Sequence, residues 1–294
     1  MNRNSLNIGY CALALGITGA LNTLKYFRLE NNFMEPLLIG TALSLLTYYI
    51  AESLKNKNRF IKEAQNRTTL TLIPTIFMAS ANMSAYIELK TLWFFIVGGH
   101  FLYSLFFYKK VLFKGLPIVS DYIPLAGLAV NIPHARLFQA DLLGWFLLLY
   151  AITGYLLVSC RLILYWKHFI TANPLPLLGI LCAPLSLCIQ GALIYLDNSL
   201  LIKGALILSL VCTFIVYLVI GAVFIRPFSL SWASLTFPTS VSALAHLQGG
   251  IFLENDKLTA IGYCEVFFSC SILMLVSIGA LIKIFPRKRL SEGH

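Results

Sequence analysis

Residues 229–245 read SLSWASLTFPTSVSALA, an apolar stretch interrupted by a proline near its middle. Phe237 directly precedes Pro238, and small or hydroxylated residues surround the pair. An interior proline removes a helix hydrogen bond and kinks the helix, at a cost of ~3 kcal/mol. In lipid, such a break is tolerated only where protein or a water-filled cavity covers the freed carbonyl group. The stretch therefore predicts a kinked membrane helix whose bend lies against protein or a cavity.

The same feature recurs in other apolar parts of the chain. A membrane-spanning helix needs about 20 apolar residues. Ten segments meet this need, at residues 8–27, 35–54, 67–87, 91–112, 118–136, 139–163, 174–195, 199–225, 229–250 and 258–284. Interior prolines occur only in the third, fifth, seventh and ninth segments, as Pro74, Pro124, Pro133, Pro184 and Pro238.

This alternation predicts an all-α integral membrane protein with ten transmembrane helices in five consecutive helical hairpins. We expect the odd-numbered helices, kinked at prolines 74, 124, 184 and 238, to form an inner ring around a pore. The even-numbered helices then form an outer ring that faces lipid. Nine spans are the alternative, because the fifth segment also carries Asp121 and Asn131 and would otherwise be taken for a loop.

The composition favours one membrane domain over residues 1–294. Hydrophobic residues make up 59% of the chain and charged residues only 12%, whereas soluble domains carry about 25% charged residues. The polar stretches between segments are short, and no GxxxxGK[ST] phosphate loop occurs, so ATP is not expected to drive this protein.

The net charge of +10 is interpreted as a topology signal and not as a sign of nucleic-acid binding. With the N-terminus inside, only six of the 22 basic residues lie on the opposite side: Lys25, Arg28, Lys90, Arg136, Lys203 and Lys257. The other 16 lie at cytoplasmic ends and loops, as the positive-inside rule requires. This asymmetry supports ten spans in an inner or plasma membrane, with both termini in the cytoplasm.

The odd-numbered segments carry hydroxyl and amide side chains but few charges. A pore lined in this way would let ions enter and also leave, because it offers no deep electrostatic well. The candidate lining residues are Thr18, Asn22, Thr75, Asn131, Ser186, Thr236 and Ser240. In the alternative interpretation, such groups bond to their own helix backbone or join helices to one another.

Phe237 is the candidate gate of this pore. A proline disfavours regular helix at the residue before it, so the Phe237 ring is able to leave the usual helical face. A bulky apolar ring closes a narrow pore by filling it and excluding water. The alternative is an ordinary core phenylalanine, since the chain contains 21 of them.

Three ionisable residues inside the apolar segments are further candidates for function. Glu265 and His100 lie on even-numbered segments, and His246 lies on the ninth, about half a helical revolution from Phe237. Each is either a group that takes part in transport or a polar group bonded to a neighbouring helix. The sequence shows no spaced cluster such as HxxxH, so we expect no metal, no cofactor and no catalytic residue.

Several short stretches together resemble a known family of membrane proteins. Trp232, Ala233 and Phe237, followed by Pro238, resemble its ninth-helix motif. The other matches are Gly9-Tyr10, Gly16 and Leu29-Glu30-Asn31 at the start, then Leu72-Ile73-Pro74, Tyr122-Ile123-Pro124 and Leu181-Cys182-Ala183-Pro184. On these residues the chain resembles the tellurite-resistance/dicarboxylate transporter family, whose members are TehA-like and related to the plant guard-cell slow anion channel. Ala14 stands where the family has a proline in its first helix.

The resemblance implies ten helices in five hairpins, one pore in each protomer and a homotrimer in the membrane lipid. It also implies that Phe237 plugs the pore. The family conducts small anions such as chloride and nitrate, or carries malate-type dicarboxylates. Tellurite resistance, after which the family is named, corresponds to no residue pattern in this chain.

The expected function is therefore passive movement of small inorganic or organic anions through a phenylalanine-gated pore. The first alternative is a proton-coupled C4-dicarboxylate (malate-type) carrier, in which Glu265 or His246 would be essential. A membrane-embedded lipid-modifying enzyme is a more distant alternative, because its candidate groups Lys167, His168 and Asp121 are scattered along the chain.

Overall fold

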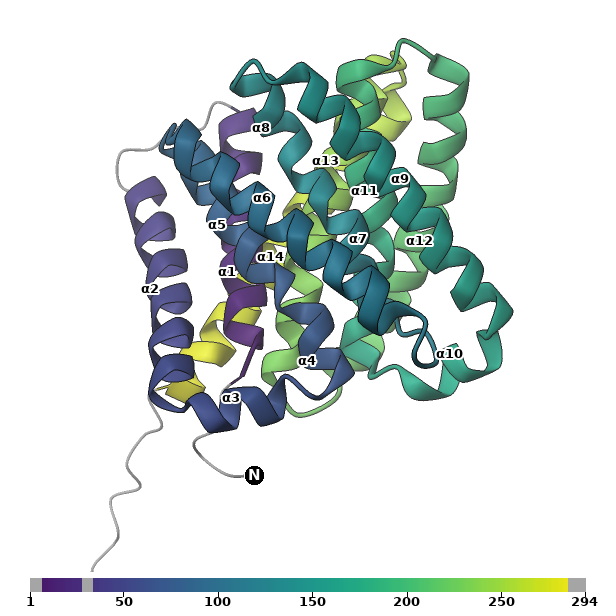
Figure 1. The fold of residues 1–294 in the computed structure, drawn as a ribbon. Coiled ribbons are helices and arrows are strands. Elements are labelled where there is room, and N and C mark those ends of the chain that lie inside the picture. Colours follow the sequence, from purple (N-terminus) through teal and green to yellow (C-terminus); the bar gives the residue numbers. More distant parts are fainter. Residues whose placement is uncertain (1–6, 28–33, 285–294) are drawn as a thin grey trace, which may run out of the picture.

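The computed structural model describes residues 7–27 and 34–284, and every regular element in these ranges is helical (Figure 1). The expectation of an all-α chain is thereby confirmed. Of the residues used above, Arg28 and the Leu29-Glu30-Asn31 stretch lie outside the described residues, as do the basic residues at 3 and 287–289.

The α-helices are α1 (Gly9–Tyr26), α2 (Met34–Lys55), α3 (Lys57–Glu63), α4 (Arg67–Leu72), α5 (Pro74–Tyr86), α6 (Lys90–Phe107), α7 (Tyr122–Ala126), α8 (Ile132–Leu137), α9 (Asp141–Leu164), α10 (Trp166–Ala172), α11 (Ala183–Tyr195), α12 (Ser199–Phe224), α13 (Thr236–Phe252) and α14 (Asp256–Ile284). Short 3₁₀ helices cover Val119–Asp121, Gly127–Asn131, Leu175–Cys182 and Leu230–Leu235, and a π-helical turn covers Tyr108–Leu112.

Six helices in the described part of the chain are long and apolar enough to cross a membrane. They are Met34–Lys55, Lys90–Leu112, Asp141–Leu164, Leu175–Tyr195, Ser199–Phe224 and Asp256–Lys283. The mean hydropathy of their most apolar windows runs from 1.4 to 2.7. The chain therefore has the character of a membrane-embedded protein.

The interior prolines coincide with changes in helix geometry. Pro74 begins α5 directly after the break at Ile73, and Pro184 is the second residue of α11, which follows a 3₁₀ helix. Pro238 is the third residue of α13, which also follows a 3₁₀ helix. A proline is tolerated in the first turn of a helix because the missing N–H has no partner there. Each proline thus opens a new helix within its apolar stretch.

The stretch around Asp121 is not a surface loop. Residues 119–137 form short α- and 3₁₀-helical pieces, and nearly all of them are buried. Asp121 is completely buried, and Arg67 of α4 forms two hydrogen bonds with its carboxylate, of 3.2 Å from Nε and 2.7 Å from Nη2. A paired carboxylate at a helix end therefore explains the charge that made this segment resemble a loop.

Burial divides the helices into two groups. All residues from 232 to 247 are buried, and they include most of α13. In the 18-residue apolar window of Leu175–Tyr195, 72% of the residues are buried, against 17–33% in the other five long helices. In Figure 1, α2 and α12 lie at opposite edges of the bundle, while α7, α11 and α13 run through its middle.

The exposed helices pack on the buried segments that precede them in the chain. α2 contacts α1, α6 contacts α5, α9 contacts α7 and α8, α12 contacts α11, and α14 contacts α13. Their outward faces carry large apolar side chains such as Phe95, Phe214 and Phe267. Large exposed apolar surfaces on long helices are stable where lipid covers them.

Candidate functional site

Two cavities meet at Phe237. The larger, which we call the vestibule, has a volume of about 620 Å³. The smaller, which we call the inner cavity, has a volume of about 40 Å³ and an almost entirely apolar wall. Phe237 and Leu187 line both cavities, so they form the partition between them.

The buried segments supply the whole lining of both cavities. The vestibule is bordered by the C-terminal parts of α1 and α5, by α8 with the 3₁₀ helix before it, and by α11 and α13. The inner cavity is bordered by the earlier parts of the same segments, including α4 and α7. None of the residues that line these two cavities comes from α2, α6, α9, α12 or α14.

Two glycines of α1 position the Phe237 ring. A methyl group at Gly19 would come within 2.9 Å of Phe237 Cδ2, and a side chain at Gly16 would collide with Thr236. Because both positions lack a side chain, α1 approaches α13 closely and the ring packs against it. Phe237 is only 5% exposed, although it contacts two cavities.

The inner cavity offers no free polar group to an ion. Leu15, Met78 and Ile180 are among its lining residues. The Thr75 hydroxyl, on the same wall, donates to the Leu72 carbonyl at 2.7 Å, and the Ser234 hydroxyl bonds to two backbone carbonyls. An apolar space of this size stays dry.

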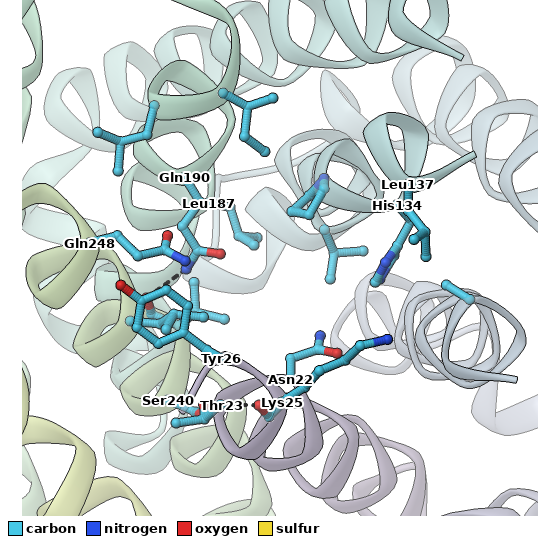
Figure 2. Close-up of a pocket in the computed structure, with 18 of the residues that line it drawn as sticks. Asn22, Thr23, Lys25, Tyr26, His134, Leu137, Leu187, Gln190, Ser240 and Gln248 are labelled. Atoms are coloured by element: carbon cyan, nitrogen blue, oxygen red, sulfur yellow. Dashed lines mark hydrogen bonds between the residues drawn. The ribbon is translucent and has the colours of Figure 1, made fainter. Parts of the chain in front are cut away.

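The vestibule has a different chemical character, which Figure 2 shows. Amide, hydroxyl and imidazole groups face it, from Asn22, Thr23, His134, Gln190, Ser240 and Gln248. Lys25 is its one charged side chain among the described lining residues, and they include no carboxylate. Among the described lining residues, the vestibule is therefore faced only by one positively charged side chain and by neutral polar and apolar groups.

Three of the seven candidate pore-lining residues border a cavity. Asn22 and Ser240 line the vestibule, where the Ser240 hydroxyl lies 3.4 Å from that of Thr23. Thr75 lines the inner cavity, but its hydroxyl bonds to its own helix backbone. Of these three residues, only Asn22 and Ser240 therefore present a polar group to the vestibule.

The other four candidates line neither cavity, and each of them makes a hydrogen bond within the protein. Thr18 donates to the Leu15 carbonyl, and Thr236 donates to the Ala233 carbonyl. Asn131 accepts a hydrogen bond of 3.2 Å from Trp93 Nε1 on α6. Ser186 bonds to the Cys182 carbonyl and to Ser209 on α12. The physical reason is that a small polar group gains more from a buried hydrogen bond than from a cavity face.

Glu265 and His246 bind each other and line neither cavity. His246 Nδ1 lies 2.8 Å from Glu265 Oε2, and His246 Nε2 lies 3.1 Å from the Ser209 hydroxyl. His246 is completely buried and Glu265 is 5% exposed. Their network joins α12, α13 and α14 and touches neither cavity.

His100 also lies away from both cavities. Its buried ring stacks on Phe77 of α5, with ring centroids 5.9 Å apart. No group of three potential metal ligands occurs within residues 7–27 and 34–284.

Sequence reasoning missed two important groups of the vestibule. Lys25 was interpreted only as a topology signal, yet it follows Asn22 by three residues and so shares its helix face. His134 lies next to Pro133 in the broken fifth segment, where no regular period indicates a face. The three-residue spacing of Asn22 and Lys25 could have indicated that Lys25 faces the same side as Asn22. No comparable sequence pattern indicated the direction of His134.

Comparison with known proteins adds no further assignment. No protein-family model matches the chain, and no curated protein matches it significantly.

Proposed function

We propose that the chain is an anion channel or facilitative anion transporter in which Phe237 closes the pathway. The observation that carries this proposal is the pair of cavities that meet at Phe237 and are lined only by the buried segments. A lining with Lys25 and neutral dipoles, without a carboxylate among the described lining residues, supports anions as the permeant class. The proposed movement is passive, and the lack of a GxxxxGK[ST] loop argues against ATP as its direct driver.

The finer architecture belongs to the same proposal. We infer ten spans in five hairpins, with the segments containing α1, α5, α7–α8, α11 and α13 as the inner ring. The packing of each exposed helix on the preceding buried segment supports this arrangement. Three protomers per assembly, an inner or plasma membrane and cytoplasmic termini remain part of the proposal through the family resemblance and the charge asymmetry.

The contacts of Glu265 and His246 favour a channel over a proton-coupled dicarboxylate carrier. A coupling carboxylate has to meet the substrate path or a proton path that touches it. These two groups bind each other and Ser209, away from both cavities. A lipid-modifying enzyme has no support, since the carboxylate of Asp121 bonds to Arg67 and to the Ile118 N–H and to neither Lys167 nor His168 within the described residues.

Electrophysiology on the purified protein in lipid tests the proposal directly. Reversal potentials are measured under separate gradients of chloride, nitrate and malate, with and without a pH gradient. A channel gives reversal potentials that follow the anion gradients alone. Potentials that follow the proton gradient would contradict a passive channel, and cation-selective potentials would contradict the anion assignment.

A further inference from the structure

The hydrogen bonds behind His134 fix which of its nitrogens carries the proton. The Thr18 hydroxyl donates to the Leu15 carbonyl at 2.9 Å, so its oxygen accepts from Asn82 Nδ2 at 3.1 Å. Asn82 Oδ1 then faces His134 Nε2 at 2.9 Å. Because an amide oxygen only accepts, Nε2 must be the donor. The neutral ring therefore has its lone pair on Nδ1.

The Nδ1 atom of His134 is free to meet an ion. Within the described residues no hydrogen bond to this atom is found. The atom is also not among the fully buried polar atoms without a partner, so it is not sealed off inside the protein. The ring lines the vestibule, so this atom is reached from the cavity. A neutral His134 thus presents a lone pair, which repels an anion, whereas a protonated one presents an N–H donor.

Lys25 lies on the same side of the vestibule. Figure 2 shows its side chain extending past Asn22 toward the His134 ring. Its ammonium also lies 5.5 Å from the centre of the Tyr86 ring, and its charge acts on His134. Among the described vestibule residues no carboxylate neutralises this pair.

The elements around His134 supply few titratable groups to the vestibule. α1 supplies Lys25 and Tyr26, and α5 supplies Tyr86. Near the end of α8, Arg136 is paired with Asp141 of α9 at 2.9 Å, and Tyr195 of α11 donates to the same carboxylate. α13 contributes only uncharged side chains to the vestibule. The charge of the vestibule therefore depends on Lys25 and on the protonation of His134.

We propose that His134 and Lys25 form a pH-dependent binding site for a small anion in the vestibule. Protonation of His134 Nδ1 converts a repelling lone pair into a donor and places a second positive charge near Lys25. By linkage, a bound anion also favours the protonated ring. This site rests on the proposed anion pathway and explains how acid on the vestibule side would raise anion occupancy. The proton stays on the protein and does not travel with the anion.

The test uses the full chain in planar lipid bilayers, with Phe237→Ala as background so that the gate does not limit the current. Chloride current is recorded at low chloride while the vestibule-side pH is lowered from about 8 to about 4, which extends below the usual histidine range because the His134 ring is buried. We expect the current to rise at least about fivefold, the lower end of typical coupling between sites. His134→Gln keeps an N–H donor for Asn82 but cannot titrate, so its current should not vary with pH. His168→Gln, on α10 and away from the vestibule, is the matched control and should keep the pH response.

A second variant keeps the inference testable if His134→Gln does not fold. Lys25→Gln removes the charge that opposes protonation of His134, so the pH response should move to higher pH while the current falls. An unshifted response, a pH-independent current in the background variant, or a response that survives in His134→Gln would each overturn the site. Those results leave the channel intact, whereas absence of anion current at every pH would overturn the proposed function itself.

Discussion

α13 and α14 follow each other in the chain and pack along each other, yet they differ in almost every property. α13 is buried nearly throughout and carries Thr239, Ser240 and Ser242. α14 has the more apolar sequence, with a window of mean hydropathy 2.2, and only 28% of that window is buried. In lipid, apolar side chains gain nothing from moving inward, whereas polar ones need protein partners. Of these two helices, the less hydrophobic one, α13, therefore lies in the interior.

The polar groups of α13 illustrate those partners. Thr239 donates to the Leu235 carbonyl at 2.8 Å, and Ser242 lies 2.6 Å from the Thr213 hydroxyl on α12. Phe237 is different, because it offers only an apolar ring and stands between two cavities. If the interior helix forms the path, changing this ring should have the largest effect of all.

Phe237→Ala should raise anion conductance by about tenfold or more, because removal of the ring joins the vestibule to the inner cavity. Single-channel recording and liposome flux measure this effect. Phe107→Ala is the matched control, since Phe107 is equally buried but lines neither cavity. The control should lose about 3–5 kcal/mol of stability without gaining conductance. Unchanged flux through well-folded Phe237→Ala protein would remove Phe237 as the gate.

Glu265→Gln should destabilise the protein by about 1–3 kcal/mol, because it replaces the carboxyl group that bonds to the buried His246 ring by an amide. Flux per folded molecule and ion selectivity should stay unchanged. Denaturation in detergent and flux assays measure the two quantities. Glu254→Gln, at the exposed end of the α13–α14 turn, is the control and should be neutral. Loss of transport at full stability would restore the proton-coupled carrier.

Gly19→Ala should cost about 1–3 kcal/mol, because the new methyl group overpacks the contact between α1 and the Phe237 ring. It should also change the conductance by displacing that ring. Gly98→Ala, on the exposed helix α6, is the matched control because nothing lies within 4 Å of the added methyl group. The control should be neutral or stabilising by up to about 1 kcal/mol, as expected from helix propensity. Equal behaviour of the two variants would contradict the close approach of α1 and α13.

Phe214→Leu should have the smallest effect, within about 0.5 kcal/mol, because its side chain on α12 is 65% exposed and lipid accommodates either residue. Thermal unfolding in lipid nanodiscs measures this change. A large loss of stability would mean that another protein surface, and not lipid, covers this face of α12.

The local features of the fold could be predicted from the sequence. Helix breaks occur at Pro74, Pro184 and Pro238 because proline lacks the N–H that would bond to the preceding helical turn. This effect is local and does not depend on the rest of the chain. The apolar lengths of α2, α9, α12 and α14 likewise follow from composition alone. The pairing of Asp121 could not be predicted in this way, because its partner Arg67 lies 54 residues away.

The direction of each polar side chain could not be predicted in the same way. Asn82 bonds to Thr18 across 64 residues, and Ser186 bonds to Ser209 on a different helix. Such partners depend on how each helix is rotated about its axis, and short broken helices have no strong period to indicate that rotation. The sequence therefore could not show that Thr18 and Ser186 bond within the protein and line neither cavity.

The sequence by itself determined that the chain is helical, apolar and broken at particular prolines, because these properties depend on neighbouring residues. Only the tertiary structure decided that Lys25, His134 and Phe237 line one vestibule, since they come from three segments far apart in the chain. The close approach of α1 to α13 at Gly16 and Gly19 sets the position of the Phe237 ring. Convergence of this kind is a property of packing between helices, and no single segment contains it.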